Sequence, residues 1–163
     1  MTNLKEIKNK IIKKENLIFG CLIIIIFYLD RISKIKILEE FSDSTYFIND
    51  FLNLNLIWNM GVGFGFLSTN SNIIYNFITI TIASVIIILL YFFVTSKTLD
   101  KVIYATIIGG ALGNFYDRLI FKAVPDFIDM HYNNFHWFTF NVADIFITIG
   151  ILFFIVKSFL VKN

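Results

Sequence analysis

The sequence of 163 residues contains a single cysteine, Cys21. One cysteine cannot close a disulfide within the chain or build a thiolate metal site, so both kinds of scaffold are excluded. We interpret Cys21 as an apolar residue within a helix, because too few apolar residues precede it for a secretory segment before a lipid-modified cysteine. We expect no cleaved signal peptide either, since the first apolar run lacks a small-residue cleavage site and continues to Asp30 and Lys34.

Other scarce features say little about function. The single proline, beside abundant Ile, Asn, Lys and Phe, indicates no activity, and the net charge of +2 is too small to indicate a partner. No internal repeat or low-complexity linker is present, and the length predicts one domain over residues 1–163. What the sequence does have is apolar residues, at 57% against about 45–50% in ordinary proteins. Because they gather in long runs, we identify an integral membrane protein.

Four apolar runs predict four transmembrane helices, at about residues 17–34, 73–95, 102–119 and 142–161. The second run contains no charged residue, and the first can approach the membrane core of about 30 Å if Lys34 extends its ammonium outward. Residues 1–16 form a basic tail with five lysines. Nine Lys and Arg residues lie in the segments expected on the cytoplasmic side and five in the others. The positive-inside rule therefore places both termini in the cytoplasm and the loops at about 35–72 and 120–141 outside.

The first outer loop contains a strand signal. Residues 52–56 alternate leucine with asparagine, which is the period of a strand with one apolar face. A glycine-rich run over 59–66 follows, where another backbone or a ligand can approach closely. Tyr46 and Trp58 suit the level of the membrane interface. The predicted fold is thus a membrane all-α core of four transmembrane helices, with a small extracytoplasmic β-sheet and an interfacial loop.

Polar residues gather at the outer ends of these helices. Asp30 and Lys34 are four residues apart, so they share a helix face and can pair. Asn114 shares a face with Asp117 and Arg118 in the same way, and we expect Asp117 to form an ion pair with Arg118. Small residues at 109–111 and 113 allow a neighbouring helix to come close.

Two further aspartates lie at the same outer level. Asp126 is in the second outer loop, and Asp144 follows 18 residues later at the start of the fourth apolar run, with Asn141 one turn before it. Asp126 can be an ordinary loop residue, and Asp144 an acidic residue favoured at a helix N-terminus. Two carboxylates brought together can instead share one proton, so that one acts as base on a water and the other as acid toward a carbonyl.

The motifs that carry a family resemblance occur in order along the chain. They are Asp30-Arg-Ile-Ser-Lys34, Asn59-Met-Gly61-Val-Gly-Phe64-Gly, Gly109-Gly-Ala-Leu-Gly-Asn114-Phe-Tyr-Asp117-Arg118, Val124-Pro-Asp126-Phe127 and Phe140-Asn141-Val-Ala143-Asp144. Together they resemble lipoprotein signal peptidase, also called signal peptidase II. The likeness covers nearly everything after the basic tail. Mild departures are Arg31 where Gln is commoner, Gly63 where Ala or Ser is usual, and Phe138-Thr139 where the family often has a proline.

The resemblance implies an aspartic endopeptidase of the bacterial inner membrane, with its active site at the outer face and with no metal or cofactor. It would remove the signal peptide from prolipoproteins just before a cysteine that carries a diacylglyceryl group. Its partners would be these substrates and membrane lipid, without nucleic acid, and the chain would act as a monomer. By motif position the residues would be Asp126 and Asp144 for catalysis, Asn59, Gly61, Asn114, Arg118 and Asn141 for substrate binding, and Asp30, Lys34 and Asp117 for structural support.

Rival hypotheses come from other classes of protein. His131 and His136, with Asp126 and Asp129, suggest a metal hydrolase, but their spacing matches none of the common zinc motifs, and activity that survives chelators would exclude it. Acidic residues within a membrane also mark transporters and proton relays. Here the acids gather at one face and the second run is uncharged, so no path crosses the membrane. Ion flux in proteoliposomes would identify a transporter, and a structural membrane subunit is the remaining alternative.

Overall fold

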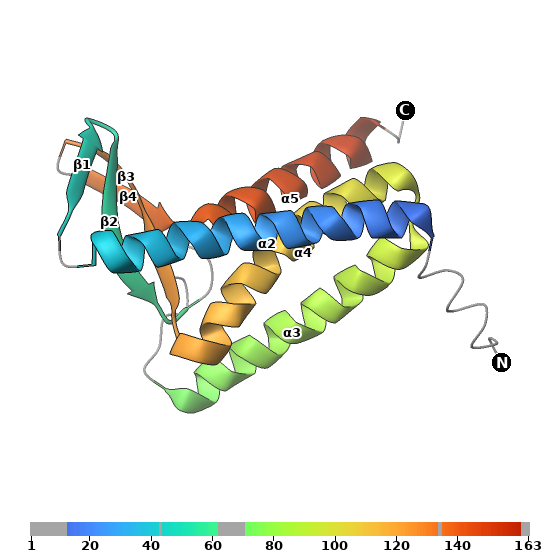
Figure 1. Cartoon of the computed structure of the whole chain (residues 1–163), viewed down its shortest axis with the longest axis horizontal. Coiled ribbons are helices and arrows are strands. Elements are labelled where there is room, and N and C mark those ends of the chain that lie inside the picture. The colour runs from blue at the N-terminus through green and yellow to red at the C-terminus, as the bar shows by residue number, and fades with distance from the viewer. Residues whose placement is uncertain (1–12, 43, 62–70, 134, 161–163) are drawn as a thin grey trace.

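The protein is represented by a computed structural model that describes residues 13–42, 44–61, 71–133 and 135–160. Within these residues the chain forms four helices and four strands. They are α2 (Lys14–Glu40), β1 (Tyr46–Asn49), β2 (Leu52–Asn59), α3 (Asn72–Thr95), α4 (Thr98–Phe121), β3 (Val124–Tyr132), β4 (Phe135–Phe140) and α5 (Val142–Leu160). The sheet lies at one end of the helical bundle, and α2 begins and α5 ends at the other (Figure 1).

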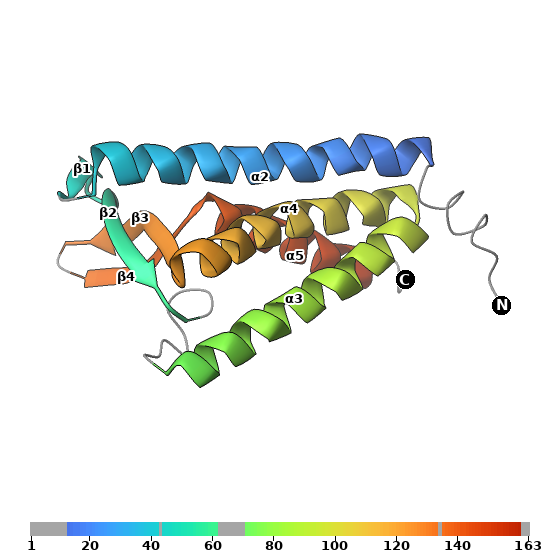
Figure 2. The same cartoon turned by 60° about the horizontal axis from the view of Figure 1, so that its bottom comes forward.

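Helix α4 is the centre of the bundle, because it packs against α2, α3 and α5. Helix α3 diverges from α2 toward the sheet (Figures 1 and 2). Two glycines of α4 permit the close approach of its neighbours. A Cβ added at Gly113 would overlap the Asp30 carboxylate of α2, and one added at Gly110 would press on the carbonyl of Ala143 in α5. The prediction that small residues admit neighbouring helices here is therefore confirmed.

The outer surface of the bundle is apolar. Large side chains of α3 and α5 are mostly exposed, including Phe77 at 71% and Phe159 at 72%. Both helices are long and apolar enough to cross a membrane, and only 17% and 11% of their spans are buried. A core helix of a water-soluble protein would be largely buried, so these faces fit a lipid environment. Helices α2 and α4 are of similar length but carry several charged residues.

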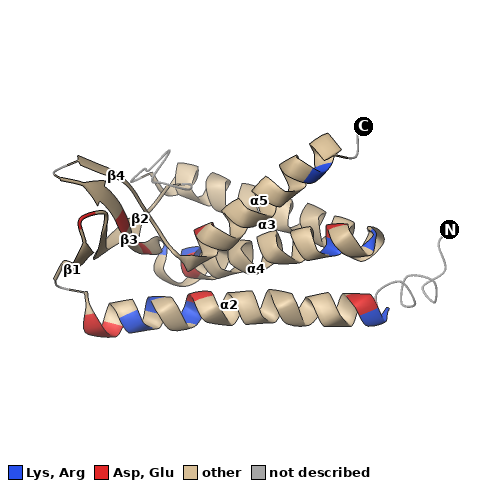
Figure 3. Ribbon diagram, turned by 90° about the horizontal axis from the view of Figure 1, so that it is seen from above, with Lys and Arg blue, Asp and Glu red and all other residues tan. Residues whose placement is uncertain are grey.

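Charged residues of the bundle lie at its two ends, and the stretch between them is almost free of charge (Figure 3). At the end far from the sheet, α3 and α4 are joined by the two-residue turn Ser96–Lys97. Lys101 is 2% exposed, and its ammonium donates to the carbonyls of Phe93 and Val94 at 3.1 Å each and to the Asn16 side chain. This lysine satisfies carbonyl groups at the end of α3 that have no partner within the helix.

The sheet is antiparallel with the order β1-β2-β3-β4. It joins two segments that are far apart in sequence, because β2 precedes α3 and β3 follows α4. In the β2–β3 register Asn59 is opposite Val124 and Ile57 is opposite Asp126. Asn59 and Asp126 are thus diagonal neighbours on one face of the sheet. A bulge between Leu54 and Ile57 interrupts this register.

The elements differ from the sequence-based expectation in three respects. Helix α2 continues to Glu40, beyond the predicted end at 34, and α4 begins at Thr98 instead of 102. The second outer segment, expected as a loop over 120–141, contains β3 and β4 and completes the sheet. Most of the glycine-rich run and of the basic tail lies outside the described residues.

Candidate active site

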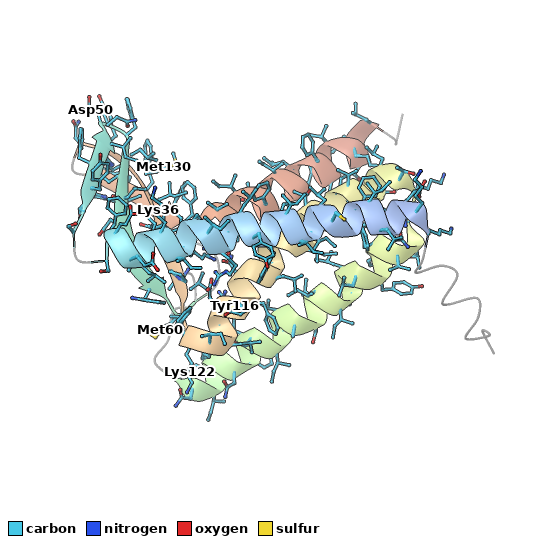
Figure 4. The ribbon with its side chains drawn as sticks, viewed as in Figure 1. Lys36, Asp50, Met60, Tyr116, Lys122 and Met130 are labelled. Carbon is cyan, nitrogen blue, oxygen red and sulfur yellow. The ribbon has the colours of Figure 1, made fainter. Side chains whose placement is uncertain are left out.

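Asp126 and Asp144, the aspartate pair, lie where the sheet meets the helices. Asp126 is the third residue of β3 and is 2% exposed, and Asp144 is in the first turn of α5. Figure 4 marks the two sides of this junction, with Met130 on the sheet and Tyr116 on α4. The structure also brings the other predicted site residues to this junction. One group surrounds Asp126 and the other surrounds Asp144, and hydrogen bonds of Asn141 connect the two groups.

Asn141 touches both aspartates. Its side-chain Nδ2 donates to Asp126 Oδ1 at 2.6 Å, and its backbone N–H donates to Asp144 Oδ2 at 3.2 Å. Its Oδ1 accepts the backbone N–H of Asp144 at 3.1 Å. The last two bonds form the reciprocal capping arrangement of a helix N-terminus. Asp144 is therefore a capping residue as well as a member of the pair, and one asparagine sets the position of both carboxylates.

Asp126 is held from the other side by Asn59, at the end of β2. Asn59 Nδ2 donates to Asp126 Oδ2 at 2.8 Å, and the backbone N–H of Gly61 donates to Asn59 Oδ1 at 2.8 Å, which orients the amide. The pKa of Asp126 is raised to about 6, first by burial and then by the charge of Asp144, while the hydrogen bonds from Asn59 and Asn141 oppose the rise. Asp126 can consequently exchange a proton near neutral pH.

Asp144 is held by Asn114 of α4. Asn114 Nδ2 donates to Asp144 Oδ1 at 2.8 Å, and Asn114 Oδ1 accepts from Lys34 Nζ at 2.8 Å. Lys34 belongs to the α2–α4 charge cluster, which we define as Asp30, Arg31, Lys34 and Asp117. The predicted Asp30–Lys34 ion pair is confirmed, at 2.8 Å.

The α2–α4 charge cluster contains two carboxylates and two cations in almost complete burial. Lys34 Nζ is 2.7 Å from Asp117 Oδ2, and Arg31 is 2.6 Å from Asp117 Oδ1 and 3.1 Å from Asp30 Oδ2. The other oxygen of Asp30, Oδ1, accepts the backbone N–H of Ala143, in the first turn of α5, at 3.0 Å. The cluster therefore joins α2, α4 and α5 beside the aspartate pair.

The predicted ion pair between Asp117 and Arg118 is wrong. Asp117 points to α2, where Arg31 and Lys34 are its partners, while Arg118 points to the end of β2. Arg118 Nη2 donates to the carbonyl of Gly61 at 2.6 Å, and Nη1 donates to the carbonyl of Asn114 at 3.2 Å. Tyr75 of α3 donates its hydroxyl to the Arg118 carbonyl at 2.9 Å. Arg118 thus ties β2 to α4 at the edge of the site.

Arg31 was missed as part of this site. The sequence marked it only as a departure from a family pattern, and the partner that explains it, Asp117, is 86 residues away. Its guanidinium also lies over the ring of Tyr116, at 4.8 Å from the centroid. A third charge beside Asp30 and Lys34 in an apolar run was the available signal, because such a charge needs a buried partner.

The residues of the rival metal hypothesis divide into two groups. His136 Nδ1 is 2.8 Å from Asp129 Oδ2, and the His131 ring stacks on that of His136 with centroids 5.4 Å apart. Asp126 instead binds Asn59 and Asn141. The aspartate pair is joined through its asparagines into one hydrogen-bonded site, whereas the histidines and Asp129 form a separate group.

The buried Asp126 and the partly buried Asp144 share Asn141 at one end of a helical bundle with apolar outer faces, an arrangement that fits the class of membrane aspartic peptidases. Comparison with known proteins gives the family. The sequence pattern described as "Signal peptidase (SPase) II" matches residues 22–160. The chain therefore belongs to the signal peptidase II family, and it is a peptidase that cleaves signal peptides from prolipoproteins.

Individual relatives agree with this assignment. A protein named lipoprotein signal peptidase from Pelagibacter ubique (strain HTCC1062) is 44% identical over 158 residues, which cover 95% of each chain. Another, from Yersinia pseudotuberculosis serotype O:1b (strain IP 31758), is 38% identical and covers 93% of this chain and 92% of its own. A solved structure described as "Bacterial membrane enzyme structure by the in meso method at 2.3 A resolution" has a TM-score of 0.77 at 28% identity and covers 89% of each chain.

Proposed function

We propose that Asp126 and Asp144 are the catalytic pair of this peptidase, and that it cleaves just before a cysteine carrying a diacylglyceryl group at the outer face of the bacterial inner membrane. The observation that carries the proposal is the double contact of Asn141, which binds one carboxylate through its side chain and the other through its backbone. A buried residue with no exposed surface that holds two acids together fits a site where both acids act on one substrate.

The proposal includes four membrane spans with both termini in the cytoplasm. Helices α3 and α5 meet the length and composition of a span by themselves. Helix α2 has 27 residues and α4 has 24, so at about 1.5 Å per residue they reach about 40 and 36 Å, more than the membrane core of about 30 Å. The charges of α2 and α4 lie toward the ends of the bundle, and the buried ones of the α2–α4 charge cluster pair with one another, as charges within a membrane must.

In the proposed reaction the pair starts with one proton. The ionised carboxylate takes a proton from water as the water oxygen bonds to the scissile carbonyl carbon, and the protonated carboxyl gives its proton to the carbonyl oxygen. When the bond from that carbon to the cysteine nitrogen breaks, the first carboxyl protonates the nitrogen and a hydroxyl of the intermediate returns a proton to the second. The pair is then ready for another turn. The pKa of Asp126, at about 6, suits this exchange near neutral pH.

The surroundings suit a lipid-modified substrate. The acyl chains of such a cysteine remain in the membrane, so its scissile bond can be presented only near the interface. A cavity of about 220 Å³ opens beside Asp144 and is otherwise lined by Met130, Phe138, Phe140, Ile145, Thr148 and Ile149. We assign this cavity to the apolar part of the substrate, and Asn59, Gly61, Asn114, Arg118 and Asn141 to its positioning. One copy of the chain, surrounded by lipid, suffices for the proposal, and no cofactor takes part.

The test is cleavage by the purified chain of two forms of one prolipoprotein, with and without the diacylglyceryl group. We expect the modified form to be shortened and the unmodified form to remain intact. Equal cleavage of both forms would show that the lipid is not recognised. A folded Asp144→Asn variant that still cleaves at more than a few per cent of the normal rate would show that the catalytic pair is misassigned.

A further inference from the structure

We propose that Lys34 is a positioning residue for Asp144, that it acts through the Asn114 amide, and that Arg31 supplies the counter-charge that keeps it in place. The proposal rests on the proposed catalytic role of the aspartate pair. It assigns to the α2–α4 charge cluster a part in the chemistry beyond the structural support expected for it.

The orientation of the Asn114 amide follows from what Lys34 can do. An ammonium has three N–H donors and no acceptor. Lys34 is 1% exposed, and its Nζ contacts three acceptors at 2.7–2.8 Å, on Asp30, Asp117 and Asn114. The Asn114 oxygen must therefore face Lys34, which leaves Nδ2 to donate to Asp144. A donor in this place favours the ionised form of the Asp144 carboxyl, whereas a rotated amide would present an oxygen and favour the protonated form.

Arg31 balances the charge of the cluster. With Arg31 the two carboxylates of Asp30 and Asp117 face two cations, and without it they would share the single ammonium of Lys34. One buried negative charge would then remain uncompensated beside the aspartate pair. Asp30 also holds the first turn of α5 through the N–H of Ala143, so a displaced Asp30 would shift the residue next to Asp144.

The charged groups that face Asp144 come from several elements. They are Lys34 and Asp30 from α2, Arg118 from α4 and Asp126 from β3. Removal of one cation from this set increases the proton affinity of the aspartate pair. Because activity needs one ionised and one protonated carboxyl, both limbs of the pH profile then move to higher pH.

The test is the pH dependence of cleavage by Lys34→Met, compared with a matched control. Lys101→Met is the control, since Lys101 is a second lysine of nearly complete burial, and it joins helices at the opposite end of the bundle. We expect both variants to lower the melting temperature. Only Lys34→Met should move the acidic limb upward, by about one pH unit, with a fall in kcat of about tenfold below the optimum and little change in KM. Lys34→Arg keeps a donor for Asn114, so its acidic limb should lie closer to the wild-type pH than that of Lys34→Met.

Arg31→Gln keeps Lys34 and provides a milder variant in case Lys34→Met does not fold. We expect it to move the acidic limb in the same direction by a smaller amount. The positioning role would be overturned if folded Lys34→Met kept its acidic limb at the wild-type pH. If Lys34→Met does not fold, the same result for folded Arg31→Gln would overturn it. If Asp144→Asn is inactive while these limbs stay unchanged, the positioning role fails and the catalytic pair stands. An active Asp144→Asn would remove the proposed function itself.

Discussion

Replacement of Asn141 by Ser and by Ala separates two roles of one side chain. Asn141 caps α5 through Oδ1 and donates to Asp126 through Nδ2. Ser can still accept the Asp144 N–H as a cap, but it is too short to replace the donor to Asp126, while Ala loses both bonds. The two variants should thus share a defect in activity and differ in stability.

The magnitudes follow from the bonds that are lost. A hydrogen bond to a charged group contributes about 1.5–3 kcal/mol, and about 1.4 kcal/mol corresponds to one pH unit. Loss of the Asn141 donor should raise the pKa of Asp126, already about 6, by about one to two further units. The acidic limb of cleavage should therefore move to higher pH in both variants. The lost cap should make Asn141→Ala less stable than Asn141→Ser by about 1 kcal/mol.

The assay is the rate of cleavage of a lipidated prolipoprotein between about pH 4 and 9, together with a thermal melt of each purified variant. The melt controls for loss of folded protein, because rates are compared at temperatures where each variant is folded. A wild-type rate and pH profile for Asn141→Ser would refute the idea that this asparagine serves the aspartate pair. Equal stability of the two variants would refute the capping role.

Three further outcomes are expected. Asp126→Asn and Asp144→Asn should each abolish cleavage while insertion is retained, and the double variant should be no worse than either, which product analysis and a membrane fractionation can establish. In a Cys21→Ser background, cysteines at positions 44 and 133 should react with an impermeant thiol reagent in intact spheroplasts, and protection of either would contradict the proposed topology. Arg118→Lys should lower activity severalfold or more in the same assay, because a lysine cannot donate to the Gly61 and Asn114 carbonyls as the planar guanidinium does. Activity equal to wild type would show that Arg118 acts only as an interfacial cation.

Local sequence patterns were sufficient for part of this fold. Helix α3 was predicted almost to the residue, because no charged residue interrupts it, and the Asp30–Lys34 pair follows from helical spacing alone. The pairing of β2 with β3 was not predictable in this way. It joins segments separated by two helices, and strand pairing depends on partners that no local pattern contains.

The same distinction between local patterns and contacts distant in sequence applies to the site. The aspartates and asparagines were found through ordered motifs, but their partners were not. Asp117 was assigned to its chain neighbour because sequence shows proximity along the chain, whereas burial in the bundle turned it toward Arg31 and Lys34. The reach of Asn141 to both carboxylates likewise depends on the meeting of β4, α5 and β3, which is a property of the whole fold.

The β2–β3 pairing has a consequence for biosynthesis. On the proposed topology, a chain made from its N-terminus delivers β2, with Asn59, to the outer side before β3 is synthesised, so the edge of β2 that pairs with β3 stays unpaired while α3 and α4 are inserted. Asp144 arrives last, on the final helix. A half-made chain therefore contains no complete aspartate pair, and on the proposed mechanism it cannot cleave substrate before α5 is in place.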